Sequence, residues 1–175
     1  MGNGTIYFVM GVSGCGKSTL GKALASDLGV QFLDADDFHP PANIRKMSQG
    51  MPLTDADRWP WLDILNAEAL RSGAGSGAVI GCSALKESYR QRLQAGLPPG
   101  KAQWICLVGS FEEISGRLRA RQGHFMPPAL LRSQFESLEE PTYGIRIPVG
   151  FGPPEAMVAE IRRLLEAGGD VGSGV

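Results

Sequence analysis

Short apolar runs alternate along this chain with longer segments in which apolar residues recur every three or four positions. Uninterrupted apolar runs are typical of strands buried on both faces, and the longer spacing is typical of amphipathic helices. The predicted strands are residues 5–10, 30–33, 78–82 and 104–108, with a weaker one at 143–149. The predicted helices are residues 20–28, 40–50, 60–70, 86–95, 112–121, 130–138 and 157–165. This alternation predicts an α/β domain in which helices wrap a parallel sheet.

The length of 175 residues fits one domain with a full-sized core. We expect residues 1–167 to form this domain and the glycine-rich residues 168–175 to be a flexible tail. Pro60 is expected in the first turn of its helix, where its missing N–H costs nothing.

Composition and charge narrow the range of partners. The formal net charge of −1 gives no broadly basic face, so we expect no nucleic-acid partner. No apolar run is long enough to cross a bilayer, and the N-terminus lacks the charged start of a signal peptide. The three cysteines have no metal-ligand spacing and are interpreted as reduced thiols. These features predict a cytoplasmic protein without a membrane partner.

A phosphate-binding loop follows the first predicted strand and precedes the first helix. Its residues, which match the pattern G-x-x-x-x-G-K-[ST] in full, are Gly11, Val12, Ser13, Gly14, Cys15, Gly16, Lys17 and Ser18. The glycines let backbone N–H groups curl around an anion, and the helix N-terminus adds its positive dipole end. Lys17 can reach the β- and γ-phosphates of ATP, Ser18 can bind Mg²⁺, and Thr19 is expected on the α-phosphate side. Cys15 is expected to be a small residue that fills space in the loop. The alternative to a phosphate-binding loop is a glycine-rich turn that contains Gly-Lys-Ser by chance.

The loop alone does not define a kinase, because GTPases and motor ATPases carry it too. The chain has no guanine-reading Asn-Lys-x-Asp, and its third predicted strand does not end in acidic residues as in motor ATPases. Acidic residues end the second strand instead, where Asp34 and Asp36 point the same way because they are two apart. One carboxylate beside Mg²⁺ and one beside an acceptor hydroxyl would suit phosphoryl transfer. The alternative is a solvated acidic turn with Asp36 or Asp37 as a helix cap.

Several blocks beyond the loop carry a family resemblance. The most specific are Phe-Leu-Asp-Ala-Asp-Asp-Phe-His-Pro at residues 32–40 and Cys-Ser-Ala-Leu-Lys at residues 82–86. With shorter matches in 43–62, 119–125 and 133–141, the chain is similar to bacterial gluconokinases over most of residues 10–141.

The resemblance implies the fold of nucleoside monophosphate kinases and shikimate kinase. That is a three-layer α/β P-loop NTPase fold with a five-stranded parallel sheet in the order 2-3-1-4-5, flanked by helices. It also implies ATP-dependent phosphorylation of D-gluconate to 6-phospho-D-gluconate by a homodimer. The similarity to shikimate kinase further implies that Asp34 lies by the Mg²⁺ and that Asp36 lies by the acceptor hydroxyl.

The chain departs from the family pattern at residues 144–152. The usual apolar fifth strand, which runs into an acidic turn, is replaced by a segment containing Arg146 and Pro148. Such a segment makes a poor central strand, and the usual acid is missing. The departure concerns the adenine side of the site and leaves the phosphate loop unchanged.

Gluconate is an anion with a row of hydroxyl groups, so its site needs a cation and several polar side chains. The candidate substrate-binding residues are Asp36, His39, Arg58, Lys86 and His124. For Arg58 the alternative is a surface ion pair with a neighbouring aspartate, and for His39 it is a cap on the following helix. Arg45 and Arg90 are expected to be surface or dimer charges.

The helix predicted at residues 112–121 carries three arginines and leads into an irregular stretch. Arg117 and Arg121 are four residues apart and share a helix face, whereas Arg119 is expected on a solvated face. We expect a mobile lid at about residues 121–130 that brings Arg121 onto the transferring phosphoryl group, with Arg117 also contacting the nucleotide.

The predicted reaction is in-line transfer with Lys17, Asp36 and Arg121 as catalytic residues. One alternative is a kinase for another small hydroxylated acid, such as shikimate. The others are a regulatory ATPase without an acceptor and an inactive ATP-binding homologue.

Overall fold

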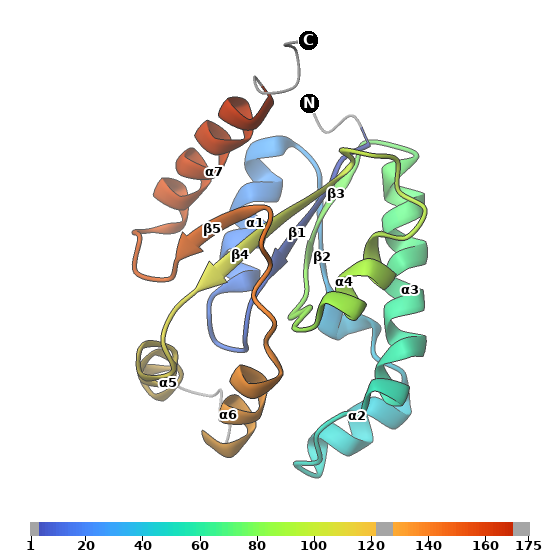
Figure 1. The fold of residues 1–175 in the computed structure, drawn as a ribbon, viewed down its shortest axis with the longest axis vertical. Coiled ribbons are helices and arrows are strands. Elements are labelled where there is room, and N and C mark those ends of the chain that lie inside the picture. The colour runs from blue at the N-terminus through green and yellow to red at the C-terminus, as the bar shows by residue number, and fades with distance from the viewer. Residues whose placement is uncertain (1–3, 122–127, 170–175) are drawn as a thin grey trace.

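The computed structural model describes residues 4–121 and 128–169 of the chain. Its sheet contains the strands β1 (Ile6–Met10), β2 (Gln31–Asp34), β3 (Ala78–Gly81), β4 (Ala102–Val108) and β5 (Ile145–Pro148). They lie in the order β2-β3-β1-β4-β5, and each neighbouring pair is parallel (Figure 1). The predicted fold class and strand order are confirmed.

Helices cover both faces of this sheet and give the molecule three layers. They are α1 (Lys17–Leu28), η1 (Ala35–Phe38), α2 (Pro41–Ser48), α3 (Asp55–Gly73), α4 (Glu87–Gln94), α5 (Phe111–Ala120), α6 (Pro128–Ser137) and α7 (Pro154–Gly169). The pair α1 and α7 lies on one face, and the pair α3 and α4 lies on the other (Figure 1).

Each face of the sheet has its own apolar core, as a sheet buried on both sides requires. Leu24 of α1 and Val9 of β1 belong to one core, whereas Leu65 of α3 and Phe8 of β1 belong to the other. All four side chains are fully buried, and consecutive residues of β1 point to opposite faces. The two cores make the sheet a rigid support for the loops at its ends.

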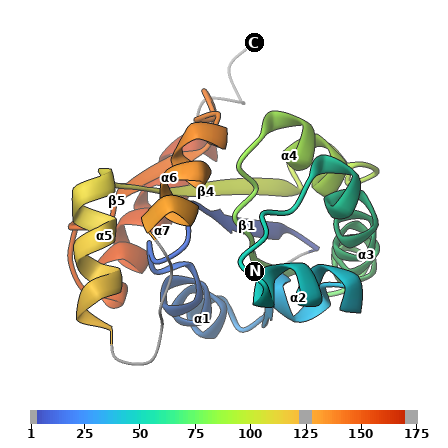
Figure 2. The same ribbon diagram turned by 90° about the horizontal axis from the view of Figure 1, so that it is seen from below.

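The loops that carry the predicted chemistry lie at the carboxyl edge of the sheet. In Figure 1 the strands point downward toward α2, α5 and α6. Seen from below in Figure 2, α5 and α6 lie on one side of this edge and α2 lies on the other. In parallel α/β sheets this edge is where ligands bind.

The start of α3 differs from the prediction. The helix begins at Asp55, where Thr54 and Asp57 form a capping box, so Pro60 lies inside the helix rather than in its first turn. The capping box satisfies the first free N–H groups, and it therefore fixes the start more strongly than a proline does. Pro60 then lacks the N–H that would bond to the carbonyl of residue 56.

The other end of the chain fits the expected course with small shifts. The weak fifth strand is present as β5 at the edge of the sheet, which is where Pro148 is tolerated. Helix α7 continues to Gly169, so it includes the first two residues of the expected tail. The rest of the predicted tail, residues 170–175, lies outside the described residues.

The cysteines are buried and free, as expected for reduced thiols. Burial raises the pKa of Cys82 to about 12 and that of Cys106 to about 11, so both remain protonated near pH 7. Within residues 4–121 and 128–169, no helix is both long and apolar enough to cross a membrane.

Candidate active site

The phosphate-binding loop connects β1 to α1 in the conformation that its glycines permit. Gly14 and Gly16 have φ values of 82° and 99°, in the left-handed region that other residues rarely adopt. Gly16 is the N-cap of α1, so the loop leads directly into the positive end of the helix. Val12 and Cys15 are buried, and Cys15 is therefore a filler of the loop, as predicted.

Lys17 stands over this loop. Its Nζ atom donates to the carbonyl oxygens of Gly11 and Val12, both at 3.0 Å. Thr19 lies two residues further along α1, is exposed, and lines neither of the two hollows that open beside this loop.

A hollow of about 350 Å³ opens beside the loop, and we call it the P-loop hollow. Its lining includes Lys17, Ser18, Asp34, Asp36, Leu118 and Arg121. The loop, the end of β2 and the end of α5 thus meet at one place. Of the six residues, all but Leu118 were expected at the site from the sequence.

Ser18 and Asp34 form an oxygen pair in this hollow. The Ser18 hydroxyl donates to Asp34 Oδ2 at 3.1 Å, and the other carboxylate oxygen accepts from the N–H of Asp36 at 3.0 Å. Among the described residues, no group of three or more His, Cys, Asp or Glu side chains is arranged to hold a metal ion. The pair fits Mg²⁺, which usually takes one or two protein oxygens and completes its shell with phosphates and water.

A second hollow, of about 370 Å³, adjoins the first, and we call it the Trp61 hollow. Its lining comes from separate parts of the chain and includes Asp36, His39, Arg58, Trp61, Tyr89 and Gln134. Ser13, Asp36 and Ser83 line both hollows, so they mark the boundary between them.

Asp36 is the titratable group at this boundary. The Asp36 side chain is 83% exposed, but protein atoms close to it and the neighbouring Asp34 carboxylate both raise the pKa of Asp36. Lys17 acts in the opposite direction. A carboxylate with a raised pKa is a stronger base, which suits a group that receives a proton from a hydroxyl.

Arg58 enters the Trp61 hollow through a fixed set of contacts. Its Nη1 atom donates to the carbonyl oxygen of Leu53 at 2.7 Å and to the Tyr89 hydroxyl at 3.2 Å. The Tyr89 hydroxyl in turn donates to Asp55. The carbonyl oxygen of Leu53 and the Tyr89 hydroxyl thereby orient the guanidinium of Arg58, whose other N–H groups can donate to a ligand.

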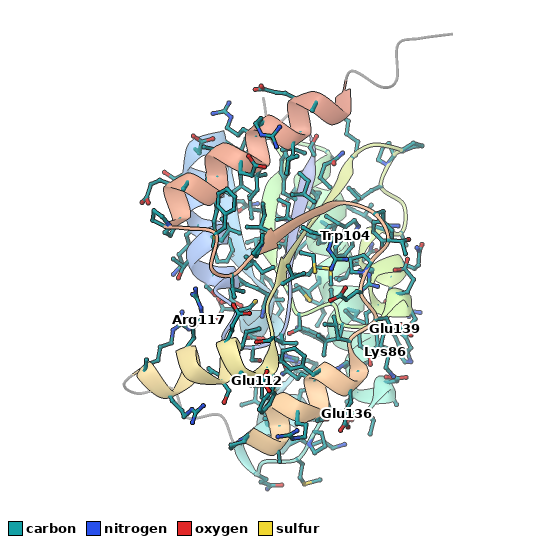
Figure 3. All side chains as sticks on the ribbon, turned by 60° about the vertical axis from the view of Figure 1, so that its left-hand side comes forward. Lys86, Trp104, Glu112, Arg117, Glu136 and Glu139 are labelled. Carbon is teal, nitrogen blue, oxygen red and sulfur yellow. The ribbon has the colours of Figure 1, made fainter. Side chains whose placement is uncertain are left out.

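Lys86 is not brought to either hollow. Its Nζ atom lies 3.2 Å from Asp55 Oδ1, and the ion pair holds the ammonium outside the lining residues. Figure 3 shows Lys86 near Glu139 and far from Arg117. Asp55 lies thirty-one positions earlier in the chain, and this long-range pairing is the physical reason for the difference from the prediction.

His39 lies in the wall of the Trp61 hollow. Its ring stacks on Trp61 with a centroid distance of 4.1 Å, and its Nε2 atom faces Asp36 Oδ1 at 3.8 Å. Burial, followed by the positive charge of Arg58, lowers the pKa of His39 to about 4. The ring is therefore neutral near pH 7.

The predicted arginines of α5 separate into different positions. Arg121 lines the P-loop hollow. Arg117 donates from Nη2 to the carbonyl oxygen of Val149 at 2.5 Å and lines neither hollow, so it lies on the β5 side of the loop (Figure 3). Arg119 is exposed, as expected. His124 lies outside the described residues.

Gln134 was not singled out from the sequence, although it belongs to the matched block 133–141. Its Oε1 atom accepts from the N–H of Ser13 at 2.7 Å, and its Nε2 atom donates to the Ser13 hydroxyl at 2.9 Å. Helix α6 is thereby attached to the phosphate-binding loop across 121 positions of sequence. Trp61 and Tyr89 were also missed as site residues, because only the fold places them in the hollow.

The prediction that Arg90 is a surface or dimer charge is wrong. Arg90 is 1% exposed, and its guanidinium donates to the carbonyl oxygens of Ala84 and Glu139, each at 2.7 Å. It also contacts Glu87 and Tyr143. These bonds hold the segment after β3, where Ala84 has an unusual φ of 46°.

Comparisons with known proteins agree with this geometry. The chain matches the AAA domain family over residues 6–141. It is 47% identical to a probable gluconokinase of Rattus norvegicus, over 91% of this chain and 97% of the relative. It is 48% identical to the thermosensitive gluconokinase of Escherichia coli (strain K12), over 79% of this chain and 73% of the relative.

Solved structures give the same result. A gluconokinase from Sinorhizobium meliloti 1021 superposes with a TM-score of 0.83 at 41% identity, covering 94% of this chain and 95% of that chain. A shikimate kinase from Bacteroides thetaiotaomicron, at 19% identity and a TM-score of 0.65, shares the fold. By its identity to these relatives and its coverage of them, the chain belongs to the gluconokinase family.

Proposed function

We propose that this protein transfers the γ-phosphoryl group of ATP to D-gluconate and forms 6-phospho-D-gluconate and ADP. The position of Asp36 carries the proposal, because this carboxylate lies where a phosphate-binding hollow meets a hollow lined by hydroxyl-binding and cationic side chains. The family relationship supports the choice of acceptor.

The P-loop hollow is the proposed site of ATP. The backbone N–H groups of the loop and the Lys17 ammonium would bind the phosphates, and Ser18 with Asp34 would hold Mg²⁺. When bound, this ion supplies positive charge that neutralises the phosphate oxygens. We assign Thr19 to the α-phosphate side and Arg117, beside Val149, to the nucleotide on the β5 side.

The Trp61 hollow is the proposed site of gluconate. Among the residues that the structure describes in its lining, Arg58 carries the positive charge. We propose that Arg58 binds the gluconate carboxylate. His39 is assigned to a substrate hydroxyl, and His124 remains a proposed contact. Lys86 is no longer favoured as a direct contact because Asp55 holds it.

The proposed chemical step balances without a further reactant. The terminal hydroxyl oxygen forms a bond to the γ-phosphorus as the bond to the β–γ bridging oxygen breaks, and Asp36 receives the hydroxyl proton. Arg121 stabilises the charge on the transferring group. The lid expected at about residues 121–130, of which 122–127 lie outside the described residues, remains a proposal. It would exclude water and so suppress hydrolysis of ATP.

We also propose that the enzyme is a cytoplasmic homodimer, in line with the family resemblance. Light scattering on the purified full chain tests the dimer, because a single mass equal to one chain would contradict it.

The first experiment measures ADP release from ATP with Mg²⁺, with and without D-gluconate. The acceptor panel adds shikimate, glucose, other aldonates and AMP. Stimulation by gluconate alone, with a phosphorylated product, is the expected result. Stimulation by another acid would show that the enzyme phosphorylates a different acceptor. A rate of ADP release that no acceptor changes would indicate a regulatory ATPase.

A further inference from the structure

Asn43 is a buried polar residue with no role in the mechanism derived so far. It lies in α2 and is 3% exposed. Its Nδ2 atom is 3.0 Å from the carbonyl oxygen of Asp57 and 3.2 Å from Nδ1 of His39. A buried amide with two partners of this kind restricts the groups that it touches.

These two contacts determine which way the amide points and where the His39 proton lies. A carbonyl oxygen can only accept, so the atom facing Asp57 must be the NH₂ group of Asn43. An amide NH₂ donates and does not accept, so His39 Nδ1 must be the acceptor of its second proton. In a neutral ring with an unprotonated Nδ1, the proton is on Nε2.

We propose that Asn43 is a positioning residue that holds neutral His39 in the Nε2–H tautomer, so that His39 offers a donor and Asp36 an acceptor to one hydroxyl group of the substrate. The inference rests on the proposed function for its kinetic consequence. Burial and the nearby charge of Arg58, which keep the ring neutral, support it.

The distance between the two groups matches a shared hydroxyl. His39 Nε2 and Asp36 Oδ1 are 3.8 Å apart, which is too long for a hydrogen bond between them. A hydroxyl oxygen about 2.8 Å from both atoms can accept from Nε2–H and donate its proton to the carboxylate. With the opposite tautomer both groups would be acceptors, and a hydroxyl with one proton could satisfy only one of them.

Nuclear magnetic resonance tests the tautomer on the full chain without substrate. The chain contains two histidines, so a His124→Gln variant labelled with ¹⁵N-histidine leaves only the His39 signals. Long-range ¹H–¹⁵N spectra near pH 7.5 are expected to show a protonated Nε2 and an unprotonated Nδ1. A protonated Nδ1 in the otherwise unchanged chain would overturn the proposal.

The isosteric Asn43→Asp variant reverses the hydrogen bond to His39 Nδ1, because a carboxylate can only accept a hydrogen bond where the amide NH₂ donates one. It is expected to move the single ring proton of His39 from Nε2 to Nδ1, which removes the Nε2 donor, and so to lower kcat/KM for gluconate about tenfold, with little change in KM for ATP. The matched control is Asn66→Asp. The Nδ2 atom of Asn66 likewise makes two hydrogen bonds, here to the carbonyl oxygens of Leu93 and Ala95, but Asn66 lines neither hollow.

A double variant separates positioning through His39 from a structural role. His39→Phe retains a stacking ring but removes the donor, so adding Asn43→Asp should lower kcat/KM no further. An additional tenfold loss in the double variant, or an Nδ1 that stays unprotonated in Asn43→Asp, would refute the proposal. The spectra are recorded without gluconate, so they can contradict the proposed tautomer while the kinase activity is confirmed. They can equally confirm the tautomer while the kinase assay fails.

Discussion

The two hollows at the carboxyl edge are built in different ways. The P-loop hollow contains a contiguous loop, which includes Lys17 and whose backbone N–H groups and glycine conformations are proposed to bind phosphates. The ends of β2, β3 and α5 complete its lining. The Trp61 hollow is formed by residues of η1, α2, α3, α4 and α6 and of the segments beside them. A site built on backbone depends on one local conformation, whereas a site built on side chains depends on tertiary contacts.

The difference indicates how substitutions should act. Changes to residues of the Trp61 hollow that do not contact the phosphate-binding loop should alter the binding of gluconate and leave ATP binding nearly unchanged. Changes that disturb the loop should do the reverse. Asp36 belongs to both hollows and should affect the transfer step itself.

The largest effect is expected at this shared residue. Asp36→Asn keeps the shape of the side chain but removes the base, so kcat should fall about 10²–10⁴-fold with a small change in KM for ATP. Steady-state kinetics measure it, with Asp37→Asn as a control because Asp37 is exposed and lines neither hollow. Wild-type turnover in Asp36→Asn would contradict the role of Asp36.

The next effect concerns the cation of the Trp61 hollow alone. Arg58→Met removes a charged partner of the substrate, so KM for gluconate should rise about 10–100-fold while KM for ATP stays the same. Arg92→Met is the matched control, because Arg92 pairs with Asp63 on the surface at 2.6 Å. An equal rise in both Michaelis constants would show that the two hollows are not independent.

A smaller effect is expected where a side chain supports the backbone site. Gln134→Ala removes both bonds to Ser13, so the loop loses part of its order and KM for ATP should rise about fivefold to tenfold. Gln103→Ala, which removes a bond to the exposed turn at Gly100, should leave KM for ATP unchanged. If only KM for gluconate changed, Gln134 would belong functionally to the other hollow.

The smallest effect concerns stability. Ala84 has a left-handed φ of 46°, which costs a non-glycine residue about 1–2 kcal/mol. Ala84→Gly relieves this strain but makes the unfolded chain more flexible, so the free energy of unfolding should rise by about 0.5–1 kcal/mol. Urea unfolding measures the change. Ala74→Gly, at a φ of −74°, should lower the free energy of unfolding instead.

Local patterns predicted the loop and the acidic residues of the P-loop hollow, but not how Asp36 reaches it. The loop motif is contiguous. The strand alternation expected for Asp34 and Asp36 does not apply, because β2 ends at Asp34 and Asp36 lies in η1, where its N–H donates to the Asp34 carboxylate. The capping box of Thr54 and Asp57 is also a local signal, but the predicted start of the helix rested on Pro60, five residues beyond Asp55. That error shows that a pair of capping side chains outranks a single helix-compatible residue.

The Trp61 hollow could be predicted only in part. Asp36, His39 and Arg58 were expected there, and the structure brings them together. Two features depend on residues far away in the chain. Lys86 pairs with Asp55 and stays outside the hollow, and Arg90 is buried among carbonyl oxygens. Such pairings have no local signal, because charge and spacing look the same for a surface arginine and a buried one.

The stacking of His39 on Trp61 also gives the molecule a natural optical reporter. Trp61 lines the hollow proposed for gluconate and donates from its indole N–H to the carbonyl oxygen of Ala35, one residue before Asp36. Trp104 stacks on Phe8 in the core, and Trp59 packs against Tyr89, so neither faces the hollow directly. Ligand entry should therefore change the fluorescence of a single indole and let binding be followed without turnover.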